Sequence, residues 1–231
     1  MIIGLRMTND GSNIAAFFDL DKTLIEGNSG WIWAKYEKRL GNISNSQLLR
    51  VAFWNILYHL SIIDMETAYS YAVEQYKNCS DKDLFDRTEK WFESDVKHLY
   101  RPQAQAAKLK HEQLGHKIVL LTSSSRYVAG TVAKHFGFKH WIANQFPLDK
   151  EGKIIGTFKR PLCYGTGKIH YAKEWAKKHD VSIENSFFYS DSYSDLPFLK
   201  EVGHPKVVTP DPRLKKVAKK MTWPILDWSL Q

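Results

Sequence analysis

Two acids one residue apart, Asp19 and Asp21, follow the apolar run NIAAFF at residues 13–18. A short run rich in apolar and aromatic residues suits a strand that is buried on both faces. Acids at the end of such a strand often cap a helix or solvate a turn, so this pair by itself has two interpretations. The other interpretation is that the two acids belong to a catalytic site, and it depends on polar groups elsewhere in the chain.

Polar groups suited to the same chemistry follow two later apolar runs. The run KIVLL leads into Thr122 and Ser123, and the run FFY leads through a serine into Asp191 and Asp195. Lys168 adds a cation near the start of a helix-like segment. Because ligands of open parallel sheets bind beyond the carboxyl ends of the strands, we expect these groups to meet in one crevice.

The predicted crevice gathers four acids, whose charges would repel one another and raise one another's pKa values. A divalent cation relieves this repulsion, and an all-oxygen ligand set without a cluster of His or Cys favours Mg²⁺ over zinc. Mg²⁺ usually keeps several waters and takes a further ligand from a substrate phosphate. The set therefore predicts phosphoryl chemistry.

The elements that must position these groups alternate between strand-like and helix-like patterns. From residue 28 to about 115 the patterns are helical only, and the longest apolar stretch, at 51–63, predicts a buried helix too short to span a bilayer. Strands are expected at KIVLLTSSS, HWIAN and SFFYS, with a hairpin turning at Glu151 and Gly152, and KVV before TPDP as the final strand.

This alternation predicts an α/β fold, namely a Rossmann-like, doubly wound parallel sheet with an inserted all-helical cap. The catalytic core is expected to comprise residues 1–27 and 105–231, and the helical cap residues 28–104.

Composition limits the class of protein. The chain has 231 residues, 43% of them hydrophobic, which is enough for one core and a sizeable insertion. Its two cysteines, Cys79 and Cys163, indicate neither a disulfide framework nor a CxxC metal site, so reduced thiols and a cytoplasmic location are expected. The apolar run before Arg6 is too short for a signal peptide, and either Met1 or Met7 could be the start.

The net charge of +8 is spread along the chain and is densest in segments with helical apolar spacing. A solvated helix face explains such segments better than a nucleic-acid-binding stripe does, so no nucleic acid is expected as a partner. The charge still suits a small anionic substrate.

Four motifs, in order and at compatible spacing, resemble those of the haloacid dehalogenase superfamily. They are FFDLDKTL, VLLTSSS, the lysine of CYGTGKIHYAKEWA, and FFYSDSYSDLPFLKEVG, and the resemblance covers nearly the whole chain. It is closest to the phosphoserine-phosphatase-like branch, subfamily IB, which carries a helical cap after the first motif. The resemblance implies a Mg²⁺-dependent phosphatase that hydrolyses a small phosphorylated metabolite through an aspartyl-phosphate.

The resemblance also implies a role for each matching residue. Asp19 is the expected nucleophile, and Asp21 the general acid that protonates the leaving oxygen and then activates water. Thr122 and Lys168 are expected to bind the phosphoryl oxygens, with Ser123 as a further substrate ligand.

The metal site is implied in the same way. Mg²⁺ is expected on the Asp19 carboxylate, the Asp21 backbone carbonyl and Asp191. Asp195 is expected to support these ligands or to add one more.

Two positions depart from the pattern of the branch. Lys22 stands where a glycine or another small residue is commoner. In phosphoserine phosphatases a glutamate nine residues after the nucleophile pairs with the substrate's amino group, and here that position is Asn28. Asn28 is therefore a candidate substrate contact, and phosphoserine is not expected to be the preferred substrate.

Two alternatives stay open. A phosphotransferase would form the same aspartyl-phosphate and differ only in the acceptor that it admits. A non-catalytic basic protein on the same fold would bind nucleic acid in a salt-dependent way and show no turnover. The residues leave the identity of the phosphomonoester and the oligomeric state undecided.

Overall fold

The computed structural model of the chain describes residues 11–50, 53 and 64–229. Six parallel strands form one sheet in the order β3-β2-β1-β4-β5-β6. They are β1 (Ala15–Phe18), β2 (Lys117–Ser125), β3 (His140–Asn144), β4 (Phe187–Ser190), β5 (His204–Val208) and β6 (Ile225–Leu226). The strand order reverses between β1 and β4, which makes this point the switch point of a doubly wound sheet. The predicted Rossmann-like architecture is confirmed.

The sheet is buried on both faces because successive strand residues point to opposite sides. Phe18 faces one core, where its ring stacks on Tyr189 at a centroid distance of 4.5 Å. Phe17 faces the other core and meets the rings of Trp175 and Phe198 edge-on, at 5.6 and 5.4 Å. All four residues of β1 are fully buried. Asp19 therefore follows a strand that is held by packing on both sides.

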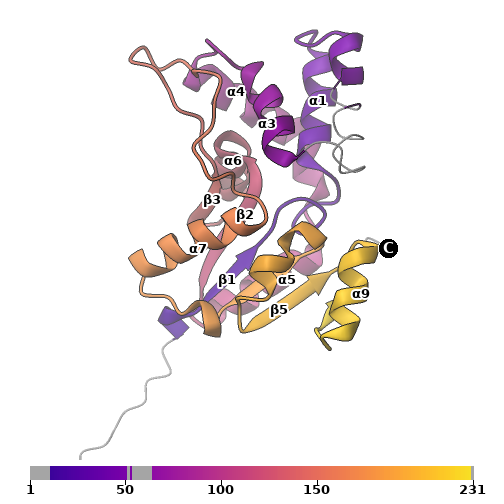
Figure 1. Ribbon diagram of the computed structural model, residues 1–231, viewed down its shortest axis with the longest axis vertical. Helices are drawn as coiled ribbons and strands as arrows, with labels where there is room; N and C mark the ends of the chain where they lie inside the picture. Colours follow the sequence, from indigo (N-terminus) through magenta and orange to yellow (C-terminus); the bar gives the residue numbers. More distant parts are fainter. Residues whose placement is uncertain (1–10, 51–52, 54–63, 230–231) are drawn as a thin grey trace, which may run out of the picture.

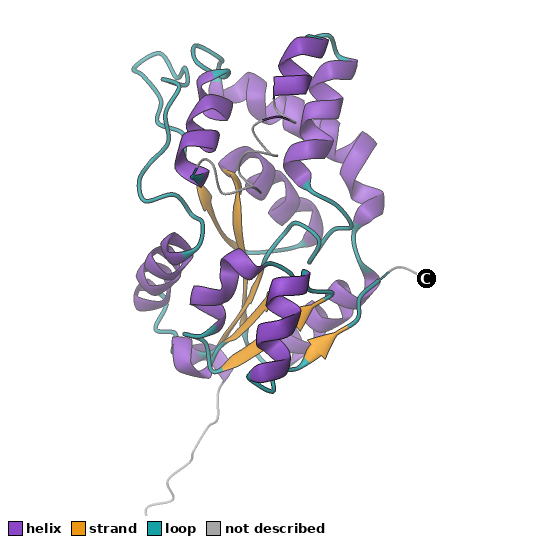
Figure 2. Cartoon of the chain, turned by 45° about the vertical axis from the view of Figure 1, so that its right-hand side comes forward, coloured by secondary structure: helices purple, strands orange, loops and turns teal. Residues whose placement is uncertain are grey.

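Helices cover both faces of the sheet and also extend beyond its carboxyl end (Figure 1, Figure 2). One core includes residues of α5 (Pro102–Gln113) and α6 (Arg126–Phe136). The other core includes residues of α7 (Thr166–Lys178), α8 (Leu196–Leu199) and α9 (Pro212–Lys220).

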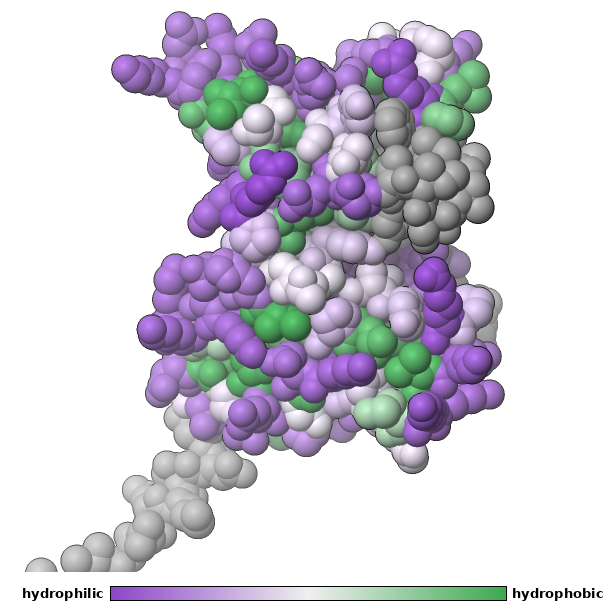
Figure 3. Space-filling view, viewed as in Figure 1, coloured by the Kyte–Doolittle hydropathy of each residue, from purple (hydrophilic) through white to green (hydrophobic). Residues whose placement is uncertain are grey.

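A second group of helices, which we call the upper part, comprises α1 (Ser29–Arg39), α3 (Met65–Glu74) and α4 (Asp81–Trp91). Asn28, Asp64 and Ser80 begin these three helices, and each side chain accepts a hydrogen bond from a backbone N–H of the first turn. A π-helical turn (Phe92–Val96) and a 3₁₀ turn (Lys97–Leu99) lead from α4 towards α5. The molecular surface narrows between the upper part and the part built on the sheet (Figure 3).

The described residues between 28 and 104 form helices, turns and isolated bridges without a regular strand, as predicted. Most of the predicted helix at 51–63 lies outside the described residues; Phe53, which is described, is helical and 55% exposed. The predicted boundaries fall just before α1 and within α5. Among the described residues, no helix is long and apolar enough to cross a membrane.

The segment 145–159 follows β3 in the chain and reaches from the core to the upper part. It reverses direction at Gly152, whose φ of +76° suits glycine, and Leu148 forms an isolated antiparallel bridge with Ile154. The expected hairpin is therefore a chain reversal without regular strands.

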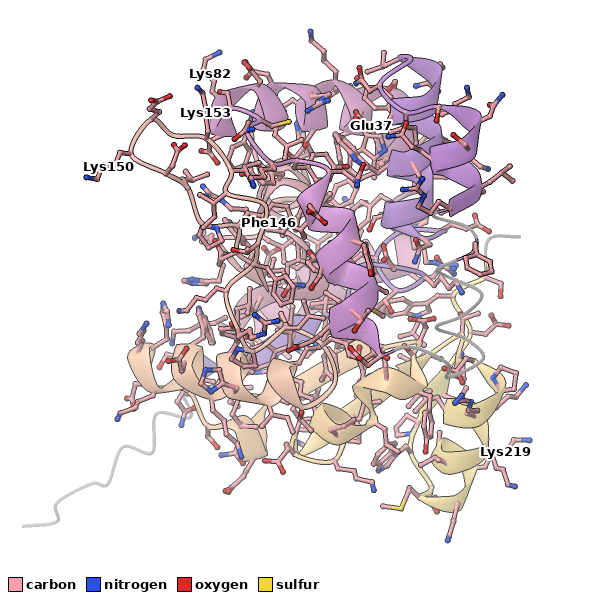
Figure 4. The ribbon with its side chains drawn as sticks, turned by 45° about the horizontal axis from the view of Figure 1, so that its top comes forward. Glu37, Lys82, Phe146, Lys150, Lys153 and Lys219 are labelled. Atoms are coloured by element: carbon pink, nitrogen blue, oxygen red, sulfur yellow. The ribbon has the colours of Figure 1, made fainter. Side chains whose placement is uncertain are left out.

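The part of this segment that follows the reversal at Gly152 pairs with the upper part. Lys153 forms an antiparallel bridge with Ser80, just before α4. Figure 4 shows Lys150 and Lys153 projecting outward near Lys82, while Phe146, at the base of the same segment, lies in the interior. The segment thus fixes the first turn of α4 to the core.

The prediction that KVV is the final strand is wrong. A two-residue strand, β6, follows α9 and pairs with Val207 and Val208 of β5 at the edge of the sheet. Two residues are too few to carry an alternating pattern, and Pro224 directly before them weakens the sequence signal for a strand.

Candidate active site

The predicted site residues lie at the carboxyl ends of three adjacent strands and at the start of one helix. Asp19 directly follows β1, and its N–H continues the pairing with a hydrogen bond to the Tyr189 carbonyl of β4 at 2.9 Å. Thr122 lies in the last half of β2, and Asp191 directly follows β4. Lys168 lies in the first turn of α7. The expected convergence at one edge of the sheet is thus observed.

Lys168 is the cation at the centre of the site. Its Nζ donates to Asp19 Oδ1 at 2.7 Å and to Asp195 Oδ2 at 2.8 Å, and the side chain is 1% exposed. Asp195 Oδ2 also accepts a hydrogen bond from Ser190 Oγ at 2.7 Å. Burial opposes the charge on Lys168, but the two carboxylates outweigh it and raise the pKa of the ammonium. Lys168 is therefore fixed in its charged form beside the expected nucleophile.

The carboxylates outnumber this cation, and their pKa values are raised. Burial raises the pKa of Asp19 to about 7, even though Lys168 opposes the rise. Burial, together with the charges of Asp19 and Asp195, raises the pKa of Asp191 to about 8. Burial also raises the pKa of Asp21. The site therefore holds more negative charge than its own residues compensate.

Two features of the site suit a divalent cation. The Oδ1 atom of Asp195 is buried and has no hydrogen-bond partner. The carboxylate of Asp191 is 7% exposed and forms neither an ion pair nor a hydrogen bond with any described residue. Within the described part of the chain, no three acidic, His or Cys side chains form a metal-binding group on their own. An ion here would need backbone oxygens or water as well, which suits Mg²⁺ better than zinc.

Asp21 is held by the start of α1. Its Oδ1 accepts the backbone N–H of Ser29 at 2.8 Å, and its Oδ2 lies 3.4 Å from Asn28 Nδ2. The Asn28 oxygen meanwhile caps α1 by accepting the N–H of Trp31 at 2.9 Å. Asn28 is exposed, so its side chain lies at the rim of the site. The role that the structure shows for this side chain is to cap α1. Lys22, next to Asp21, is also exposed and has a φ of +54°.

The residues after Thr122 form a hydrogen-bonded loop. The N–H of Ser124 donates to Thr122 Oγ1 at 3.1 Å, and the Ser124 hydroxyl lies 2.8 Å from that of Ser29. Ser125 caps α6 by accepting the N–H of Val128. Ser123, the predicted substrate ligand, is half-buried, and its carbonyl accepts a hydrogen bond from a side chain of β3.

Three residues of this site were missed by the sequence reasoning, namely Ser29, Asn144 and Ser190. Ser29 joins Asp21 to the loop after Thr122, and Ser190 holds Asp195. Asn144 links that loop to the segment before Lys168. Ser190 directly precedes Asp191 and could have been found there, whereas Ser29 and Asn144 have no local signal beyond a helix start and a strand end.

The chain is similar to known hydrolases over most of its length. The model of the haloacid dehalogenase-like hydrolase family matches residues 16–200. A probable phosphatase of Mycobacterium tuberculosis is 30% identical over 219 residues, which cover 93% of this chain and 75% of that protein. The histidinol-phosphatase of Neisseria meningitidis is 25% identical over 218 residues, covering 92% of this chain and 98% of the relative.

The fold is also that of a solved enzyme. A structure of phosphoserine phosphatase, described as a phospho-aspartyl intermediate analogue, superimposes with a TM-score of 0.68 at 15% identity and covers 94% of each chain. The match to the family model confirms the predicted family, and the phosphatase names of the relatives agree with the predicted phosphoric monoester hydrolase. The chain belongs to the haloacid dehalogenase-like hydrolase family.

Proposed function

We propose that the protein is a Mg²⁺-dependent phosphatase that hydrolyses a small phosphomonoester through an aspartyl-phosphate on Asp19. The observation that carries this proposal is the buried Lys168 ammonium, 2.7 Å from Asp19 and 2.8 Å from Asp195. A lysine so placed neutralises part of the charge that a phosphate brings to a carboxylate nucleophile. The acids that this single lysine leaves uncompensated support the metal dependence.

Asp19 is the attacking group. Its Oδ1 is held by Lys168, which orients the carboxylate towards the space beyond the end of β1. In-line attack on phosphorus forms the Asp19 acyl-phosphate and expels the leaving oxygen. The Lys168 ammonium and the Thr122 hydroxyl donate hydrogen bonds to the phosphoryl oxygens, and Ser123 is proposed as a further contact.

Asp21 moves the protons. Its raised pKa favours a protonated carboxyl that donates to the leaving oxygen, and the resulting carboxylate then takes a proton from the attacking water. The Ser29 N–H at 2.8 Å fixes the orientation of this carboxyl group.

The proposed Mg²⁺ ligands are the carboxylates of Asp19 and Asp191 and the backbone carbonyl of Asp21, with Asp195 in support. The uncompensated Asp191 carboxylate and the orphaned Oδ1 of Asp195 fit this assignment. When bound, the ion would neutralise phosphate charge and favour attack by a carboxylate.

We propose that residues 28–104 form a cap of the subfamily IB type over the site, and that the protein acts in the cytoplasm on a small phosphorylated metabolite. The names of the relatives make phosphoserine and histidinol phosphate candidate substrates. Asn28 argues against phosphoserine because its neutral amide gives a substrate ammonium no charged partner.

Phosphate release from a panel of metabolite phosphomonoesters tests the proposal. The panel includes both candidates, each assayed with Mg²⁺ and with EDTA, and added alcohols serve as alternative acceptors. We expect release that requires Mg²⁺ and Asp19. Release that persists equally in EDTA would contradict the metal dependence, and transfer to alcohols in preference to water would indicate a phosphotransferase.

A further inference from the structure

Asn144 is a buried amide at the end of β3 that connects two segments of the proposed active site. Its Nδ2 donates to the Ser123 carbonyl at 2.7 Å, and its Oδ1 accepts the Cys163 N–H at 2.7 Å. The residue is 1% exposed. Both ends of the amide are therefore engaged with backbone groups, and the side chain has one fixed orientation.

The first connection fixes the loop that carries Thr122. Asn144 holds the carbonyl end of the peptide between Ser123 and Ser124, and the N–H end of the same peptide donates to Thr122 Oγ1 at 3.1 Å. A peptide plane held at both ends cannot rotate without breaking one of these bonds. Because Thr122 Oγ1 accepts from Ser124, its hydroxyl hydrogen can donate to a phosphoryl oxygen.

The second connection fixes the turn that carries Lys168. Cys163 begins a close-packed turn into α7, in which Gly165 has a φ of +53°. A Cβ on Gly167 would come within 1.8 Å of the Leu162 carbonyl, so the backbone of this turn has no room to shift. Anchoring the Cys163 N–H therefore fixes where the first turn of α7, with Lys168, begins.

A residue of the upper part also reaches Asn144. Tyr69 of α3 is half-buried, and its hydroxyl interacts with the Asn144 amide. The Tyr69 ring packs edge-on against Phe146 and Phe158, at centroid distances of 6.3 and 5.3 Å. The position of α3 is thereby linked to the same amide.

We propose that Asn144 is a positioning residue that sets the spacing between Thr122 and Lys168 for binding the transferring phosphoryl group. Tyr69 ties this spacing to the position of α3. The inference deepens the proposed phosphatase function and rests on it.

Two substitutions of Asn144 test the inference. Asn144→Asp keeps the shape and the acceptor for Cys163 but replaces the donor to Ser123 with a carboxylate oxygen. Asn144→Leu removes both bonds at similar volume. Gln145→Leu is the matched control, because Gln145 lies next in the chain and, among the described residues, its side-chain amide hydrogen-bonds only to the Ala143 carbonyl.

We expect kcat of both Asn144 variants to fall by about a hundredfold, with KM changed by much less, because misplaced oxyanion donors cost most in the transition state. The affinity for orthovanadate should fall in parallel, and Gln145→Leu should match the wild type. Tyr69→Phe should lower kcat by a smaller factor.

Asn144→Asp provides a readout that loss of stability cannot mimic. Once protonated, the new carboxyl group can again donate a hydrogen bond to the Ser123 carbonyl. The kcat of Asn144→Asp relative to wild type should therefore recover at acidic pH, whereas the relative kcat of Asn144→Leu should not. Burial raises the pKa values of the neighbouring Tyr69 and Cys163, so both stay neutral across this range.

Several outcomes would overturn the inference. Folded Asn144→Leu enzyme with kcat within twofold of wild type, whatever its Tm, would show that the residue has a structural role only. An unchanged kcat in Tyr69→Phe would remove the link to α3. A wild-type protein without activity on any phosphomonoester would instead refute the proposed function, and orthovanadate binding would still report on Asn144.

Discussion

Replacing Asp191 with asparagine should stabilise the metal-free protein at neutral and alkaline pH. The pKa of Asp191 is raised to about 8 by burial and by the charges of Asp19 and Asp195. The folded state therefore keeps a proton that the unfolded state releases near pH 4. Since the folded state binds the extra proton, the free energy of unfolding falls as pH rises from about 4 to about 8. An asparagine removes this cost.

The size of the effect follows from the shift. A rise from 3.8 to about 8 corresponds to an upper limit of roughly 6 kcal/mol at alkaline pH. Relaxation and water entry reduce such penalties, and we expect a gain of about 3 kcal/mol for Asp191→Asn. For a chain of this length that corresponds to a rise in Tm of roughly 6–12 °C.

Thermal unfolding in EDTA across the pH range measures this prediction. Glu184→Gln is the control, because it removes one negative charge from an exposed residue. The gain of Asp191→Asn should disappear below pH 4, and Mg²⁺ should stabilise the wild type much more than the variant. A variant with a Tm equal to or below that of wild type at pH 8 in EDTA would refute the reasoning.

Three further predictions concern turnover. Asp19→Asn should abolish activity while leaving the fold intact, and beryllofluoride should raise the Tm of wild type but not of the variant; a variant with a tenth of wild-type activity would argue against Asp19 as nucleophile. Asp21→Asn should slow hydrolysis of alkyl phosphates more than that of p-nitrophenyl phosphate, and equal losses would leave Asp21 with a structural role only. The ratio of kcat/KM for phosphoserine to that for uncharged phosphomonoesters should stay below about tenfold, because Asn28 replaces a charged partner; a larger ratio would show that another residue binds the ammonium.

Much of the fold and the central part of the site could be predicted from the sequence. Asp19 and Asp191 each directly follow a buried strand, so their place at the carboxyl edge of a parallel sheet follows from local pattern and fold class. Lys168 lies in the first turn of a helix, and its position relative to Asp19 was inferred from the order of the motifs. The resemblance supplied the roles that the pattern could not.

The rest of the site depends on contacts between distant segments. Asn144 contacts Cys163 nineteen positions further on and Ser123 twenty-one positions earlier. The sequence of the strand HWIAN predicts neither hydrogen bond. The segment 145–159 pairs with itself through Leu148 and Ile154, as expected, but Lys153 also pairs with Ser80 of the upper part, which was not expected. Such pairings are set by tertiary packing, which local propensity does not report.

Trapping the covalent intermediate tests the central claim most directly. The protein is mixed with Mg²⁺ and the best substrate of the panel, quenched in acid within one turnover, digested and analysed by mass spectrometry. We predict one phosphoryl group on the peptide that contains Asp19, located to Asp19 by borohydride reduction of the acyl-phosphate and absent from Asp19→Asn. Rapid phosphate release without any phosphorylated Asp19, at quench times that resolve single turnovers, would contradict the proposed mechanism.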